Sequence, residues 1–169
     1  ANNWGADVFL SIHLNADPYG AGFGVETWFL SPGDSSEEAK NLVAAEEGHY
    51  HEAGHHEPSQ GNVIDHIVAD AQHRAALAAS ETLADSIVRH LHLTTGSRFR
   101  GVKQARFGVL VEAKMPAIVV ECGFFSHRDE GTQLVNTAYL DKVARGIFEG
   151  LIAYDRQIGG RRTARSEHL

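Results

Sequence analysis

Two short, nearly continuous apolar runs, each ending in a titratable side chain, constrain the fold of this chain most. Residues 6–13 read ADVFLSIH and end at His13, and residues 117–121 read AIVVE and end at Glu121. Such a run is typical of a strand buried on both faces, as in a parallel or mixed sheet. Because ligands bind outside the carboxyl ends of these strands, His13 and Glu121 are the first pair to consider for chemistry.

Segments of helical periodicity alternate with the predicted strands. The capping-box pattern of Ser35 and Glu38 predicts a helix start near residue 36. In chain order we expect strands at 6–13 and 25–30, a helix from about 36, a helix over 76–92, strands at 107–111 and 117–122, and a helix over 137–154. This alternation predicts a single α/β domain with a mixed, mostly parallel sheet flanked by helices.

Composition excludes several classes of protein. The chain has 169 residues and is 43% hydrophobic, which suits one domain with a real core. Its formal net charge of −7 argues against nucleic-acid binding, and no apolar run reaches the length of a membrane span. The single cysteine, Cys122, excludes an intrachain disulfide. It follows an apolar strand, so a buried thiol is the more natural interpretation than a nucleophile.

Histidine is the most unusual feature of the composition, since four of the eleven histidines fall within residues 49–56. His51, Glu52 and His55 fit the H-E-x-x-H pattern, in which two histidines bind zinc and the glutamate activates water. Gly54 and Pro58 suit the required helix badly. A zinc metalloprotease and a solvated His-rich loop therefore both stand as interpretations of this segment.

Taken together, four blocks of the sequence resemble one known family. The blocks are GADVFLSIHLNA (5–16, preceded by AN at 1–2), GVETWFL (24–30), RGVKQARFGVL (100–110) and PAIVVECGFFS (116–126). In order and spacing they are similar to the zinc-dependent N-acetylmuramoyl-L-alanine amidases of the amidase type 3 group, and the last helix agrees as well. The resemblance covers residues 1–155.

The resemblance implies a zinc hydrolase that cuts the amide between N-acetylmuramic acid and L-alanine of the peptidoglycan stem peptide. It implies that His13 is a zinc ligand and that Glu121 is the catalytic carboxylate. Zinc would lower the pKa of bound water and polarise the scissile carbonyl, while Glu121 moves the proton. The substrate implies a location in the periplasm or cell wall.

The sequence also departs from the family pattern. The family's other two zinc ligands, a His and a Glu, stand in blocks that precede the one at His13, and this chain begins after them. We therefore expect an N-terminally incomplete catalytic domain over 1–155, a polar tail over 156–169, and weak zinc binding with no activity for this piece alone. His127 stands where the family usually has Asn, which leaves the role of that position open.

An inserted His-rich segment at 34–75 resembles the regulatory region of amidases that act in cell separation. There a glutamate occupies the zinc until an activator protein displaces it, and Glu46 and Glu47 are the nearest candidates. A plain surface excursion is the alternative for this segment. For the whole chain, a metalloprotease of the H-E-x-x-H type and a non-catalytic cell-wall-binding fragment remain as alternatives.

Overall fold

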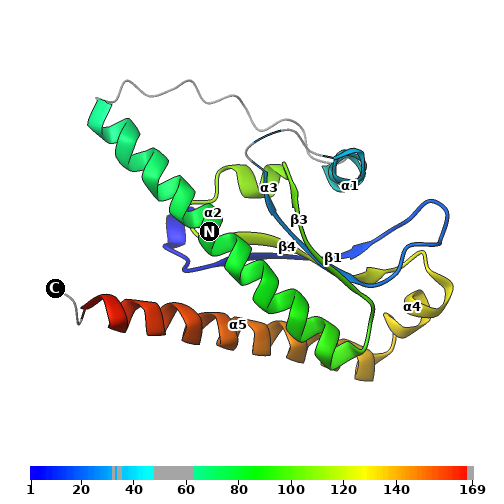
Figure 1. The fold of residues 1–169 in the computed structure, drawn as a ribbon. Coiled ribbons are helices and arrows are strands. Elements are labelled where there is room, and N and C mark those ends of the chain that lie inside the picture. Colours follow the sequence, from blue (N-terminus) through cyan, green and yellow to red (C-terminus); the bar gives the residue numbers. More distant parts are fainter. Residues whose placement is uncertain (32, 34–35, 48–62, 167–169) are drawn as a thin grey trace.

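The computed structural model describes residues 1–31, 33, 36–47 and 63–166 (Figure 1). The strands in this part of the chain are β1 (Phe9–Asn15), β2 (Val25–Leu30), β3 (Phe99–Ala105) and β4 (Ala117–Phe124). The helices are α1 (Glu37–Glu47), α2 (Val63–Thr95), α3 (Gly108–Val111), α4 (Arg128–Gln133) and α5 (Thr137–Ser166), and a 3-10 turn at Asn2–Trp4 precedes them.

The strands form one mixed sheet in the order β1-β4-β2-β3. β1 pairs with β4 and β2 with β3 in parallel, while β2 and β4 run antiparallel. Every residue of β4 is buried, which explains its continuous apolar run, because a central strand covered on both faces has no solvent side. The run at 6–13 predicted the same burial for β1, and this prediction is wrong: β1 lies at the edge of the described sheet, and its Ile12 is 59% exposed. The predicted fold class, a mixed and mostly parallel sheet flanked by helices, is confirmed.

Helices α2 and α5 lie side by side on one face of the sheet (Figure 1). The larger core cluster lies between this pair of helices and the sheet, and it includes Ile87 and Val120. Close approach of the two helices depends on Gly150, where an added Cβ would lie 2.7 Å from the Cα of Ile87. The hydroxyl of Ser86 donates a 2.7 Å hydrogen bond to the carbonyl of Gly150 at the same crossing.

The opposite face of the sheet carries α1, α3 and a second core cluster around Trp28. The Trp28 indole packs edge-on against Phe107 at a centroid distance of 6.0 Å. Ala39 and Leu42 of α1 are buried in the same cluster, which confirms the helical spacing expected for this segment. Because residues alternate along β2, Glu26 lies on this face together with Trp28.

The strand predicted at 107–111 is wrong. Gly108–Val111 forms the short helix α3, in which Leu110 is buried, and the preceding strand is β3 at Phe99–Ala105. β3 is an edge strand that carries Arg100 and Lys103 and has few apolar residues, so it contains no apolar run that would indicate a strand.

Two helices are longer than the apolar stripe predicts. α2 begins at Val63 rather than near residue 76, and residues 67–75 of it are exposed. α5 continues to Ser166, so the prediction that this helix ends near residue 154 is wrong. The polar tail over 156–169 stays a prediction. The first extension contains three alanines and the second four arginines, and both residue types favour helix without needing a core to face. Within the described segments, no helix has both the length and the apolar character needed to cross a bilayer.

Candidate functional site

The two residues singled out in the sequence lie next to each other on neighbouring strands. His13 of β1 is the register partner of Glu121 of β4, and Glu121 is also the partner of Glu26 of β2. Register partners place their side chains on the same face of a sheet, with Cβ atoms about 4.5–5.5 Å apart. His13, Glu121 and Glu26 therefore form one row across three strands, on the face that carries α1.

Glu121 is completely buried in this row. Burial, together with the neighbouring charge of Glu121, raises the pKa of the Cys122 thiol to about 12. A thiol with that pKa carries almost no thiolate near neutral pH, so Cys122 is a buried structural residue rather than a nucleophile.

His13 is half-buried, and its Nε2 lies 2.7 Å from the hydroxyl of Ser11. A catalytic zinc ion takes three protein ligands and keeps one open position. Among the residues that the structure describes, no three His, Cys, Asp or Glu side chains are placed to hold a metal ion. The described residues therefore do not by themselves fit a catalytic zinc site, and His13 is one candidate ligand without a complete set around it.

Glu26 is the member of the row that sequence reasoning missed. It is 1% exposed, yet both of its carboxylate oxygens are fully engaged. Oε1 accepts hydrogen bonds from Asn15 Nδ2 (3.0 Å) and Trp28 Nε1 (3.1 Å). Oε2 accepts from Arg100 Nε at 2.5 Å and pairs with Lys103 Nζ at 2.9 Å. A lone Glu inside the run VETWFL is the signal that could have indicated it, because a buried carboxylate requires partners.

A bulge in β3 explains how two cations reach one carboxylate. The pairing of β2 and β3 shifts between Val25 and Glu26, and Gly101 takes a positive φ of 82°. In a regular strand, residues three apart point to opposite faces, whereas the extra residue of a bulge re-aims the side chains around it. Arg100 and Lys103 therefore both face Glu26 and also contact Glu38 of α1.

An open pocket of about 680 Å³ lies beside this cluster. Its walls come from the end of β1 and the loop after it, from β2, from α1, from the start of β3 and from the end of β4. They include Asn15, Asp17, Glu26, Glu38, Arg100 and Phe124. Asp17 shapes the loop by accepting hydrogen bonds from the backbone N–H groups of Tyr19, Ala21 and Gly22. These hydrogen bonds lower the pKa of Asp17, and the one from the N–H of Tyr19 has the largest effect.

The carboxyl end of β4 is fixed by a second buried carboxylate, Glu130 of α4. It accepts hydrogen bonds from the backbone N–H groups of Gly24 (3.1 Å) and Phe124 (2.6 Å) and from the hydroxyl of Ser97 (2.6 Å). Glu130 thereby joins the residue before β2, the end of β4 and the turn before β3. His127, whose role the sequence left open, caps α4 through Nδ1, which accepts from the N–H of Glu130 at 3.3 Å.

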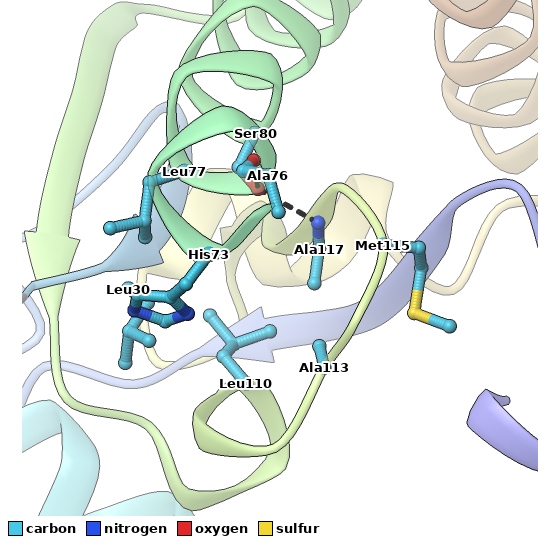
Figure 2. Close-up of a pocket in the computed structure, with 9 residues that line it drawn as sticks. All are labelled: Leu30, His73, Ala76, Leu77, Ser80, Leu110, Ala113, Met115 and Ala117. Carbon is cyan, nitrogen blue, oxygen red and sulfur yellow. Dashed lines mark hydrogen bonds between the residues drawn. The ribbon is translucent and has the colours of Figure 1, made fainter. Parts of the chain in front are cut away.

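A smaller cavity between α2, α3 and the start of β4 is not a ligand site (Figure 2). Its volume is about 10 Å³, enough for at most one water molecule. Ser80 lies at its wall, where its hydroxyl accepts a 2.9 Å hydrogen bond from the N–H of Ala117. This contact fixes the start of β4 against α2.

Several predicted residues lie outside the described part of the chain. These are the H-E-x-x-H residues His51, Glu52 and His55, the whole cluster from His49 to His56, and the side chains of Glu46 and Glu47. Ser35 also lies outside it, and the hydroxyl of Ser36 caps α1 by accepting from the N–H of Ala39. Glu38, expected in the cap, contacts Arg100 and Lys103 instead.

Comparison with known proteins gives one consistent family. The family model described as N-acetylmuramoyl-L-alanine amidase matches residues 1–153. The amidase LytC of Bacillus subtilis (strain 168) is 29% identical over 151 residues, covering 89% of this chain and 22% of LytC. The amidase AmiA of Escherichia coli (strain K12) is 29% identical over 155 residues, covering 91% of this chain and 54% of AmiA.

A solved structure supports the same grouping. The N-acetylmuramoyl-L-alanine amidase of Clostridium difficile 630 superposes with a TM-score of 0.62 at 28% identity, over 90% of this chain and 60% of that one. The chain thus spans less than two thirds of the length of each of these relatives.

Proposed function

This chain belongs to the family of N-acetylmuramoyl-L-alanine amidases, and from that premise we propose that the protein cleaves the bond between N-acetylmuramic acid and L-alanine in peptidoglycan. The observation that carries the proposal is the register pairing of His13 with Glu121 on neighbouring parallel strands. The family resemblance implies that the first is a metal ligand and the second a catalytic carboxylate, and both roles are part of the proposal. Their adjacency is what a shared reaction centre requires.

In the proposed reaction Glu121 acts as general base and then as general acid. A water oxygen attacks the carbonyl carbon of the lactyl amide, and a Glu121 oxygen accepts the proton of that water. When the carbon–nitrogen bond breaks, Glu121 delivers the proton to the leaving nitrogen. The products are the carboxylate of the muramic acid side chain and the free amino group of L-alanine.

The burial of Glu121 adds a condition to this proposal. Its side chain is inaccessible to solvent here, and it does not line the 680 Å³ pocket. Water and substrate can therefore reach it only if groups on the α1 face of the sheet move. Such an opening would be part of the catalytic cycle.

Zinc dependence remains a proposal that follows from the resemblance. His13 would be one ligand, and the others would have to come from outside the described residues, since these hold no group of three ligands. Action on peptidoglycan would also place the protein in the periplasm or cell wall. Control by an activator protein through the segment at 34–75 stays a prediction, which deletion of residues 46–73 would test by its effect on the basal rate.

The experiment is release of stem peptides from purified sacculi by the protein expressed from its complete reading frame. Mass spectrometry should find peptides with a free L-alanine amino group and glycan strands that keep intact muramic acid. Cleavage inside the stem peptide would instead support the metalloprotease alternative, which the family match does not favour. Sacculi that bind the protein but stay whole would support a non-catalytic binding fragment.

A further inference from the structure

The cluster of Glu26, Glu38, Arg100 and Lys103 joins two parts of the fold. Glu26 and both cations belong to the sheet, whereas Glu38 belongs to α1. Glu26 already pairs with both cations and accepts from two neutral donors, so the sheet satisfies this buried carboxylate without α1. Without Glu38, the sheet part of the cluster holds two cations and one carboxylate, and a net positive charge faces α1.

The two cations are fixed before any ligand arrives. The side chains of Arg100 and Lys103 are only 20% and 21% exposed. The guanidinium lies 4.9 Å from the centroid of the Phe124 ring, and Lys103 Nζ lies 4.9 Å from that of Trp28. Cations held by a buried carboxylate and by aromatic faces lose little further freedom on binding an anion, which favours recognition.

Glu38 binds Arg100 and Lys103 in the way that the carboxylate of a ligand would. One oxygen, Oε1, accepts from Lys103 Nζ at 2.6 Å and from Arg100 Nη2 at 2.9 Å. The hydrogen bond from Lys103 lowers the pKa of Glu38. The side chain is nevertheless 57% exposed, so another carboxylate arriving from solvent can exchange with it.

We propose that Arg100 and Lys103 form a binding site for a carboxylate of the substrate peptide, and that Glu38 occupies this site in the absence of substrate. The open pocket borders the site, because Glu38 and Arg100 are among its walls. Glu26, which holds the cations, is the register partner of Glu121. A peptide whose amide reaches Glu121 can therefore place a nearby acidic side chain on Arg100 and Lys103.

This inference names a substrate class, peptides with a free carboxylate a short distance from the scissile amide. Its role in catalysis rests on the proposed function, whereas carboxylate binding does not. Removing Glu38 should strengthen binding of such peptides. The apparent affinity of a site is proportional to the fraction of time that the site is not occupied by a group of the protein itself. If Glu38 fills the site about nine-tenths of the time, its loss raises the affinity about tenfold.

The test compares the wild-type protein with Glu38→Gln, using acetyl-Ala-Glu-amide and acetyl-Ala-Gln-amide as probes. The indole N–H of Trp28 reports the site, because it donates to Glu26 and its ring lies under Lys103. A titration followed by the indole NMR signal should show the acidic probe binding Glu38→Gln about tenfold more tightly than wild type. The neutral probe should leave the signal unmoved.

Two variants make the result specific. Glu37→Gln is the matched control, because Glu37 is the preceding residue and pairs with Lys40 instead; it should bind the acidic probe as the wild type does. Lys103→Gln combined with Glu38→Gln should lose the binding, while Arg100 still pairs with Glu26. Circular dichroism of each variant checks that it is folded. Equal affinity of folded Glu38→Gln and wild type, or equal binding of both probes, would overturn the proposal.

The binding assay is independent of turnover. If the acidic probe binds as expected but sacculi are not cleaved, the carboxylate site stands and the proposed amidase function fails. If sacculi are cleaved but the probe does not bind, the amidase function stands and this inference fails.

Discussion

Glu26 and Glu121 are register partners on the antiparallel strands β2 and β4, and both are buried. Adjacent buried carboxylates repel each other unless charges or donors compensate them. For Glu26 the compensation comes from Arg100 and Lys103. Two cations of the sheet therefore neutralise Glu26, the neighbour of Glu121. This pairing stabilises the row of polar side chains within an otherwise apolar face of the sheet.

Replacing Glu130 by Gln should destabilise the fold. The carboxylate accepts from two backbone N–H groups and one hydroxyl in a buried position, and the amide NH₂ of Gln would face one of those donors. We expect a loss of about 2–4 kcal/mol in the free energy of unfolding, measured by urea denaturation. Asp129→Asn, at the exposed neighbouring residue, is the control and should change stability by less than about 0.5 kcal/mol.

Acid should break the contact of Glu38 with Arg100 and Lys103. The pKa of Glu38 is lowered in the folded protein, chiefly by its hydrogen bond from Lys103, so the contact contributes stability above the ordinary pKa of a glutamate. That contribution is lost as the pH falls through the lowered pKa. The indole NMR signal of Trp28 should shift in this acidic range in the wild type but not in Glu38→Gln. If the indole signal shifts over the same pH range in the wild type and in Glu38→Gln, the signal reports the titration of another group and the prediction is wrong.

Cys122 should be chemically inert in the folded protein. With a thiol pKa of about 12, the thiolate fraction at pH 8 is on the order of 10⁻⁴. Reaction with iodoacetamide at pH 8 should be very slow until denaturant is added, and Cys122→Ala should retain activity. Rapid labelling of the native protein would contradict the buried position of the thiol.

Zinc should bind only weakly at His13, because the residues that the structure describes offer no three-ligand cluster around it. Zinc content after dialysis is the measurement, and His13→Ala is the comparison. The His-rich segment can bind zinc on its own, so only zinc lost in His13→Ala is counted. One tightly held zinc per chain that depends on His13 would contradict the prediction.

Continuous apolar runs made two strands predictable, the central strand β4 and the edge strand β1. β1 and β4 follow the runs at 6–13 and 117–121, and their parallel pairing brings His13 beside Glu121, as their positions at the carboxyl ends of the two runs suggested. β3 was missed because an edge strand needs no apolar run.

The carboxylate cluster could not be predicted in the same way. Residues 100 and 103 belong on opposite faces of a regular strand, and only the bulge at Gly101 brings both to Glu26. A bulge depends on how two strands pair, which the order of residues along one strand does not specify. Glu38 was expected to cap its own helix, and its contacts with Arg100 and Lys103 likewise depend on where α1 docks.

The most direct measurement is cleavage of sacculi by Glu121→Gln, in the protein expressed from its complete reading frame. Loss of the general base should lower the rate about 10²- to 10⁴-fold while circular dichroism stays unchanged. Glu52→Ala, which removes the glutamate of the H-E-x-x-H pattern, is the control and should keep the wild-type rate. A folded Glu121→Gln protein that releases stem peptides at the wild-type rate would contradict the proposed role of Glu121.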